Sequence, residues 1–281
     1  MSMLGKTVVI TGATSGIGEV AAIRLAEQGA RIVFTARDVK RADATLAKLR
    51  KANGAAEHVA HLAELSLLAE QKRVASEMAA EPRIDVLINN AGALFNHRIE
   101  TADGLEMTFA LNHMSYFAIT HLLLDKLKAT PGARVVSTSS RAHRGARLDF
   151  EDLQARRKFR GFQVYGRSKL CNILFTRALA KRLAGSRVTA NCLHPGFVAT
   201  RFGDQSGGLL QHVVAMGKSL MAISEEDGAK TIIYLASSPD VAMTSGEYFN
   251  ACKVETPTAE AQDDADAERL WRLSEKIAGF S

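Results

Sequence analysis

The chain has 281 residues, a length that suits a single α/β domain, and its hydrophobic fraction of 47% supports a substantial core. No apolar run approaches the roughly 18 residues that span a bilayer, and the N-terminus leads into a short strand. We therefore expect a cytoplasmic protein with no signal peptide and no integral membrane segment. The net charge of +6 suits a phosphorylated partner, but no nucleic-acid motif accompanies it, and the three cysteines lack metal-like spacing, so neither nucleic acid nor a metal is expected.

Short apolar runs alternate with longer amphipathic stretches along the chain. The runs that predict strands are residues 6–11, 31–36, 58–62, 85–89, 134–138, 187–193 and 247–249. The stretches that predict helices are residues 17–28, 39–52, 67–80, 104–130, 163–184, 225–237 and 264–277. This alternation predicts the α/β class, with a doubly wound parallel sheet of about seven strands covered by helices on both faces. We expect one domain over residues 1–281, ending in the helix at 264–277.

A glycine-rich turn joins the first predicted strand to the first helix. Its residues are Thr11, Gly12, Ala13, Thr14, Ser15, Gly16, Ile17 and Gly18. The glycines permit a tight turn and let a pyrophosphate approach backbone N–H groups at a helix N-terminus, where the partial positive charge favours an anion. The strand–turn–helix context predicts a dinucleotide site on a Rossmann fold, although glycines that serve only the backbone geometry would give the same pattern.

The choice of cofactor is indicated at the end of the second predicted strand. Ala36 takes the place where a carboxylate usually binds a ribose 2′-hydroxyl, and Arg37 follows it, where an arginine can bind a 2′-phosphate. This favours NADP(H), while NAD(H) stays possible. Asp38 is expected to cap the next helix, and Ser15 is a second group that can reach the phosphate.

Tyr165 and Lys169 stand four residues apart in a predicted helix, so their side chains share one face. An ammonium beside a phenol lowers the phenol's pKa from its usual value of about 10, and the tyrosine can then exchange a proton near pH 7. The same spacing also arises by chance on solvated helices. The glycine turn in the same chain favours the chemical interpretation.

Together these motifs resemble the short-chain dehydrogenase/reductase family over nearly the whole chain. The residues that carry the resemblance are the glycine turn, Asn89-Asn90-Ala91-Gly92, Asn112, Ser140, Tyr165 with Lys169, and Pro195-Gly196 with Thr200. The chain is most similar to the retinol-dehydrogenase-like and WW-domain-oxidoreductase-like branch, through segments such as residues 139–143, 194–196 and 246–252. The family's usual aspartate after the third strand is replaced by Glu64, followed by Leu65, and the longer side chain can still accept from the adenine amino group.

The resemblance implies an NADP(H)-dependent oxidoreductase that interconverts a carbonyl and an alcohol by hydride transfer. Tyr165 would be the general acid/base, Lys169 would lower its pKa and hold the nicotinamide ribose, and Ser140, rather than the neighbouring Ser139, would bind the substrate oxygen. Asn112 would steady a water linked to Lys169, although an asparagine that bonds backbone in the core suits the same position. The expected cofactor contacts are Gly12, Thr14, Ser15, Gly16, Ile17, Gly18, Arg37, Glu64, Leu65, Asn90, Ala91, Gly92, Tyr165, Lys169, Pro195, Gly196, Val198 and Thr200, of which the turn at 89–92 serves mainly to support the sheet.

Two segments near the expected site bear on the substrate. The basic stretch at residues 141–160 suits an anionic substrate, a membrane surface, or a solvated loop with local ion pairs. The stretch at 201–224 is expected to form a lid with an apolar inner face, which favours a lipophilic carbonyl or alcohol, although the same residues would also serve packing on the core or on a second subunit.

The resemblance also implies that the chain associates with further copies of itself, and it leaves two alternative functions open. The family commonly pairs through the helices that hold Asn112 and Tyr165, so a homodimer or homotetramer is expected. The rivals are a non-catalytic nucleotide-binding scaffold protein and a reductase of a carbon–carbon double bond. The complete set of Asn112, Ser140, Tyr165 and Lys169 argues against the scaffold.

Overall fold

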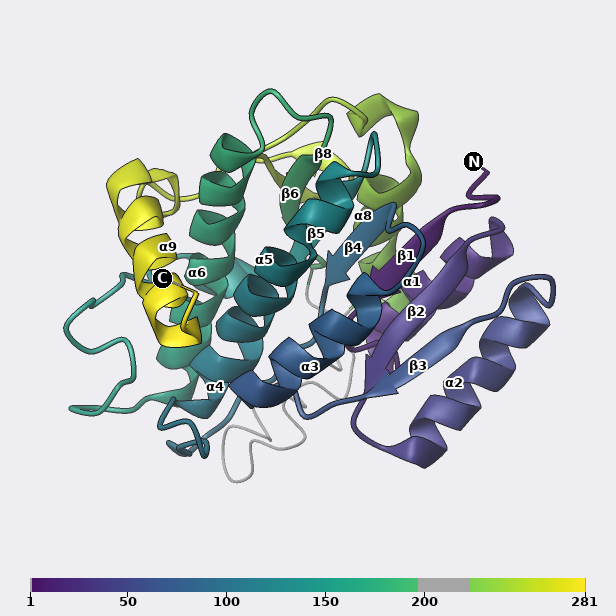
Figure 1. Ribbon diagram of the computed structural model, residues 1–281. Helices are drawn as coiled ribbons and strands as arrows, with labels where there is room; N and C mark the ends of the chain where they lie inside the picture. The colour runs from purple at the N-terminus through teal and green to yellow at the C-terminus, as the bar shows by residue number, and fades with distance from the viewer. Residues whose placement is uncertain (1, 197–222, 281) are drawn as a thin grey trace.

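The computed structural model describes residues 2–196 and 223–280, with an eight-stranded sheet at its centre (Figure 1). The strands are β1 Thr7–Ile10, β2 Arg31–Ala36, β3 Val59–Leu62, β4 Val86–Asn89, β5 Arg134–Thr138, β6 Thr189–His194, β7 Tyr248–Asn250 and β8 Lys253–Val254. They are ordered β3-β2-β1-β4-β5-β6-β7-β8, and only the β7–β8 pairing is antiparallel. The predicted doubly wound parallel sheet is confirmed, with one strand more than expected.

Helices cover both faces of this sheet. The longer ones are α1 Gly16–Glu27, α2 Val39–Ala52, α3 Leu68–Ala79, α5 Ser115–Lys128, α6 Gly161–Arg182, α8 Glu225–Ser237 and α9 Asp264–Ala278. Helices α1, α2 and α8 lie on one face, and α3, α5 and α6 lie on the other (Figure 1). Val8, Val9 and Ile10 of β1 are all fully buried, but Val9 packs in the core beside α3 and α5, while its two neighbours pack beside α1. Successive strand residues point to opposite faces, so a continuous apolar run is what a strand covered on both sides requires.

The predicted helix at 104–130 is interrupted. A short helix α4 (Met107–Phe109) is followed by a π-helix η1 (Ala110–Met114) and then by α5. The Glu106 carboxylate caps α4 by accepting from the backbone N–H groups of Thr108 and Phe109. The wide turn of η1 carries Asn112, whose side chain bonds a neighbouring loop, so a tertiary contact sets this interruption.

Strand β8 is the element that the sequence did not predict. Ala251 and Cys252 join β7 to β8, and both have a positive φ, of 47° and 62°. Two-residue hairpin turns of this kind usually take asparagine or glycine, so Ala-Cys gives no signal for one. The result is a short antiparallel edge beside β7.

The order of the strands determines where a ligand can bind. The chain runs outward from β1 to β3 and then returns to place β4 on the other side of β1. The carboxyl ends of the strands at such a switch point form the usual ligand crevice of α/β sheets. Across residues 2–196 and 223–280, every helix is too short or too polar to cross a membrane.

Candidate active site

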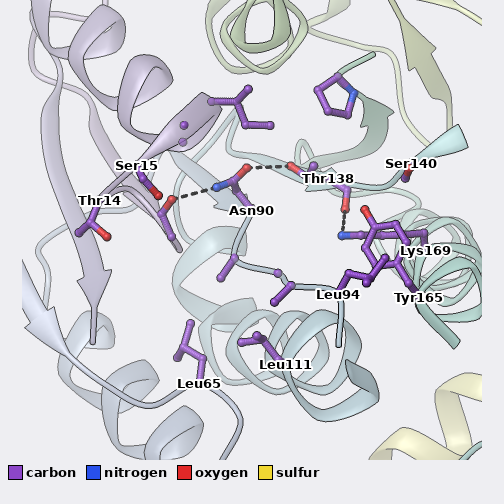
Figure 2. Close-up of a pocket in the computed structure, with 18 of the residues that line it drawn as sticks. Thr14, Ser15, Leu65, Asn90, Leu94, Leu111, Thr138, Ser140, Tyr165 and Lys169 are labelled. Atoms are coloured by element: carbon purple, nitrogen blue, oxygen red, sulfur yellow. Dashed lines mark hydrogen bonds between the residues drawn. The ribbon is translucent and has the colours of Figure 1, made fainter. Parts of the chain in front are cut away.

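A cavity of about 1220 Å³ lies at this edge of the sheet, between the glycine turn and helix α6 (Figure 2). Seventeen of the predicted site residues line it: Gly12, Thr14, Ser15, Gly16, Ile17, Gly18, Arg37, Glu64, Leu65, Asn90, Ala91, Gly92, Ser140, Tyr165, Lys169, Pro195 and Gly196. Asn112 does not line the cavity, and Val198, Thr200 and residues 201–222 of the predicted lid at 201–224 fall outside the described residues. The structure therefore brings residues of seven segments to one cavity.

Each glycine of the turn has its own physical role. Gly12 and Gly16 have φ values of +70° and +61°, which side chains with a Cβ rarely adopt. A Cβ on Gly18 would lie 2.2 Å from the carbonyl oxygen of Gly12, so this glycine lets α1 pack against the turn. Ser15, the N-cap residue of α1, makes no capping bond with its side chain and lines the cavity. The turn therefore needs glycine for its backbone conformation, and it also leaves the N-terminus of α1 without a side-chain cap.

Asn90 holds the glycine turn against β4. Its side-chain nitrogen donates to the carbonyl oxygens of Thr11 and Gly12, at 3.2 and 3.0 Å, and its backbone N–H donates to the Thr11 hydroxyl. Thr138 donates to its side-chain oxygen at 3.4 Å (Figure 2). These contacts of Asn90 support the glycine turn, which is the role that the sequence predicts for residues 89–92.

Two arginines lie at the end of the cavity next to β2. The Arg37 guanidinium is 3.9 Å from the Glu64 carboxylate, and Arg41 donates to the carbonyl oxygen of Thr14 at 3.0 Å. Asp38 caps α2 by accepting from the backbone N–H of Arg41, which confirms its predicted role. Arg41 was missed by the sequence analysis, although its place in the first turn of α2 beside Arg37 was a usable signal.

Glu64 is oriented by its own turn. One carboxylate oxygen accepts from the backbone N–H and the hydroxyl of Ser66, at 3.1 and 2.9 Å, while the other faces Arg37. The side chain is therefore fixed at the edge of the cavity, in the position where the family places an aspartate.

Tyr165 and Lys169 are both buried at the opposite end. The Lys169 ammonium donates to the carbonyl oxygen of Thr138 at 3.1 Å and lies 5.6 Å from the centre of the Tyr165 ring (Figure 2). Burial lowers the pKa of Lys169 to about 7. Burial also raises the pKa of Tyr165 above its usual range, and a hydrogen bond with Ser140 opposes this shift. The net shift of the Tyr165 pKa is therefore upward, because burial disfavours the charged form of the phenol, and the lowering of this pKa by Lys169 stays a prediction.

The two serines after β5 differ in their contacts. The Ser139 hydroxyl donates to the carbonyl oxygen of Lys169 at 2.8 Å and so fastens α6 to the end of β5. Ser140 hydrogen-bonds the Tyr165 side chain and also accepts from the backbone N–H of Ala142. This geometry favours Ser140 as the group that meets a substrate oxygen.

Asn112 is fully engaged with its neighbours. Its side chain accepts from the backbone N–H of Ala93 and donates to the carbonyl oxygen of the same residue, both at 2.9 Å, and it also donates to Ser168. A Cβ on Gly92 would lie 3.1 Å from the Asn112 side-chain oxygen and 3.4 Å from the Lys169 ammonium. Asn112 therefore lies one layer behind the cavity, as the core-asparagine alternative predicts.

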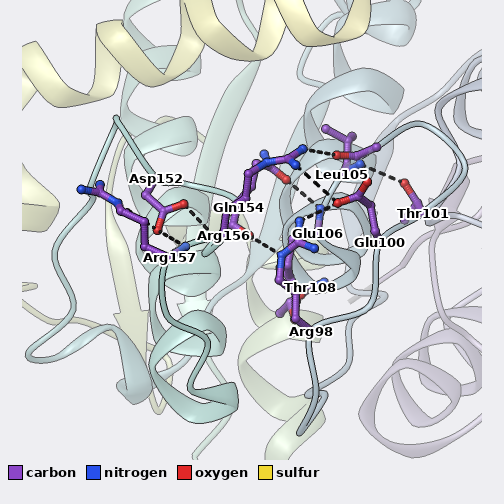
Figure 3. A network of polar contacts seen from close by, with 11 residues as sticks. Arg98, Glu100, Thr101, Leu105, Glu106, Thr108, Asp152, Gln154, Arg156 and Arg157 are labelled. Carbon is purple, nitrogen blue, oxygen red and sulfur yellow. Dashed lines mark hydrogen bonds and ion pairs between the residues drawn. The ribbon is translucent and has the colours of Figure 1, made fainter.

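Part of the basic stretch forms local ion pairs (Figure 3). Arg156 lies 3.7 Å from Glu100 and donates to the carbonyl oxygen of Gly104, while Arg157 pairs with Asp149 at 2.8 Å. Arg156 thereby fastens the stretch to the segment before α4, while Arg157 is paired within the stretch, and the local-ion-pair interpretation is confirmed for both arginines. Arg141 and Arg144 differ, because they line the cavity together with Phe162.

Comparison with known proteins gives consistent matches. A family model described as short chain dehydrogenase matches residues 6–207. The chain is 39% identical to Retinol dehydrogenase 14 of Homo sapiens, over 99% of this chain and 88% of that protein. Among solved structures, an uncharacterized protein from Mycobacterium paratuberculosis has a TM-score of 0.79 and 32% identity, over 99% of this chain and 95% of that one. A short chain dehydrogenase from Burkholderia cenocepacia in complex with NADP has a TM-score of 0.71 and 25% identity, over 90% and 100% of the two chains.

Proposed function

Because the chain belongs to the short-chain dehydrogenase family, in its retinol-dehydrogenase-like branch, we propose that it interconverts a carbonyl and an alcohol on a lipophilic small molecule with NADP(H). The observation that carries the proposal is one cavity lined at one end by the glycine turn with two arginines, and at the other by Ser140, Tyr165 and Lys169. The first end suits a dinucleotide and the second suits a substrate oxygen.

The cavity fits the cofactor on its own geometry. Positive φ at Gly12 and Gly16 and the missing Cβ at Gly18 leave the backbone of the turn open to a pyrophosphate. Arg37 and Arg41 supply two guanidinium groups where a 2′-phosphate would lie, and the solved relative from Burkholderia cenocepacia contains NADP. When bound, the cofactor supplies or accepts the hydride.

The side chains then have separate tasks in reduction. Ser140 donates a hydrogen bond to the substrate oxygen as negative charge develops on it, and Tyr165 gives that oxygen its proton. The raised pKa of Tyr165 keeps the phenol protonated at neutral pH, as a proton donor must be. Lys169 would hold the cofactor's ribose. Asn112 positions the loop after β4 through its hydrogen bonds with the backbone of Ala93.

The substrate end of the cavity favours an apolar molecule. Leu94 and Phe162 line it, and the Phe162 side chain is exposed. The relatives named retinol dehydrogenases suggest a long apolar alcohol or aldehyde as the substrate class. Its identity, the single-domain organisation, the lid and the cytoplasmic location stay predictions.

NADPH oxidation against aldehydes, ketones and enones tests the proposal. We expect aldehyde or ketone reduction, a kcat/KM at least about 10-fold higher with NADPH than with NADH, and a fall in kcat of roughly 100-fold or more in Tyr165→Phe. Replacing Arg37 with Gln should shrink the cofactor preference and leave kcat with saturating cofactor nearly unchanged.

Three outcomes would contradict parts of this proposal. Tight NADPH binding without turnover on any substrate would support the scaffold function. Saturated ketone as the product from an enone, instead of an allylic alcohol, would support the double-bond reductase. Unchanged turnover in Tyr165→Phe would remove the proton donor from the mechanism.

A further inference from the structure

The two ends of the cavity carry different charges. Among the described residues that line it, the carboxylates are Asp38 and Glu64, both at the end next to Arg37. The substrate end is lined by Arg141 and Arg144, and no carboxylate of the described residues lines the cavity there. A lipophilic neutral substrate gives no reason for two guanidinium groups beside Ser140.

Glu255 neutralises one of these two arginines. Its carboxylate lies 2.7 Å from the Arg144 guanidinium but 3.9 Å from that of Arg141, and its second oxygen also accepts from Asn250. A close ion pair fixes Arg144, whereas Arg141 is held at the limit of an ion pair with its side chain 59% exposed. Arg141, Arg144 and Glu255 together therefore carry one positive charge in excess, and it lies on Arg141.

Arg141 also contacts the His194 ring, which already receives another hydrogen-bond donor. The backbone N–H of Gly196 donates to Nδ1 of His194 at 3.1 Å, and Arg141 Nε points a second N–H at Nε2 of the same ring, at 3.2 Å. A neutral imidazole accepts at one nitrogen only, and a protonated one accepts at neither. At least one of the two donors is thus unsatisfied in every protonation state. The Gly196 donor is a backbone group, whereas the Arg141 side chain is more than half exposed, so the arginine is the group that can turn to another acceptor.

We propose, resting on the function proposed above, that Arg141 is a specificity-determining residue that binds a carboxylate on the substrate. The carboxylate would take up the excess charge and the unsatisfied Nε–H in a two-point contact, which suits the planar guanidinium. Arg144, held by Glu255, adds positive potential beside it. The substrate class is then an apolar molecule with a reacting carbonyl at Ser140 and Tyr165 and a carboxylate at Arg141, that is, an oxo acid or the corresponding hydroxy acid.

A matched pair of aldehydes tests the inference. The probes are 4-formylbenzoate and its methyl ester, which differ in charge but share the reacting group. With NADPH, we expect Arg141→Gln to lower kcat/KM for the acid by roughly 10- to 100-fold, mainly through KM, and to change it far less for the ester. Arg141→Lys should recover part of the loss. Arg147→Gln is the control, because Arg147 pairs with Glu260 and does not line the cavity, and it should match the wild type on both probes.

The outcomes separate this inference from the proposed function. An acid-to-ester ratio that stays the same in Arg141→Gln would overturn the role of Arg141 and leave the oxidoreductase intact. If the wild type reduces neither probe, calorimetric titration of the NADPH-bound protein with benzoate and with benzamide decides the matter. Benzoate binding that is lost in Arg141→Gln would support the inference, while equal binding of the two compounds, or of benzoate to the two proteins, would overturn it.

Discussion

At the residue scale, Lys169 shows how strongly burial governs this site. Its pKa is lowered from 10.5 to about 7, because the ammonium is buried, where it donates to the Thr138 carbonyl oxygen. Between these two values the unfolded chain binds more protons than the folded one, so this group makes the free energy of unfolding rise with pH. Below pH 7 the lysine is charged in both states, and the full cost of burying the charge is present.

Replacing Lys169 with Met removes that dependence. Relative to the wild type, we expect the free energy of unfolding of Lys169→Met to be highest below pH 7. This difference in stability should shrink by on the order of 3 kcal/mol by pH 10. Urea unfolding of both proteins at pH 6, 8 and 10 measures the difference, in which all other titrating groups cancel. A difference that is constant across this range would show that Lys169 is not desolvated.

The sequence predicted the membership of the site better than its electrostatics. Ser140, Tyr165 and Lys169 follow from spacing and resemblance because they lie on adjacent strand ends and helix turns. The direction of the pKa shift of Tyr165 does not follow from the sequence, because it depends on how much water the fold removes from the phenol. Arg41 was missed for a related reason, since its contact with Thr14 exists only once α1 and α2 lie side by side.

At the scale of elements, local signals fixed most boundaries. Helix α2 begins and ends where predicted, because Asp38 caps it and the residues after Ala52 are poor helix formers. The π-helix η1 was not predictable, since its sequence contains neither glycine nor proline and its wide turn coincides with the bonds from Asn112 to Ala93. Strand β8 was missed because its turn lacks the residues that usually mark one.

The packing of η1 against the loop after β4 gives a prediction for Gly92. An added Cβ would press on the Asn112 side-chain oxygen and touch the Lys169 ammonium, so Gly92→Ala should lower kcat by roughly 10-fold while costing about 1–2 kcal/mol of stability. Gly54→Ala is a matched control, because its Cβ would meet the Arg50 carbonyl at a similar 3.2 Å, far from the cavity. Kinetics and thermal unfolding of both variants test this, and an equal fall in kcat in the two would mean that the effect is not local to the site.

At the scale of the whole molecule, helix α9 determines which surfaces remain for assembly. Its Trp271 stacks on Phe175 of α6 at 5.8 Å and meets Phe117 of α5 edge-on at 5.0 Å. After α9, Phe280 stacks on His121 of α5 at 4.5 Å. Helix α9 thus packs along α6 (Figure 1), and Trp271 and Phe280 reach α5; these are the two helices through which the family resemblance implied pairing.

We therefore expect the homodimer or homotetramer implied by the resemblance not to form through α5 and α6. Light scattering after size exclusion at micromolar concentration should give a mass near the 30.3 kDa of one chain. If the mass is larger, Leu122→Glu separates the two routes, because Leu122 is the exposed apolar side chain of α5. An oligomer that survives this substitution uses another surface, as expected. An oligomer that dissociates would show that α9 leaves α5 open to a partner, because burying a new negative charge at that contact costs free energy.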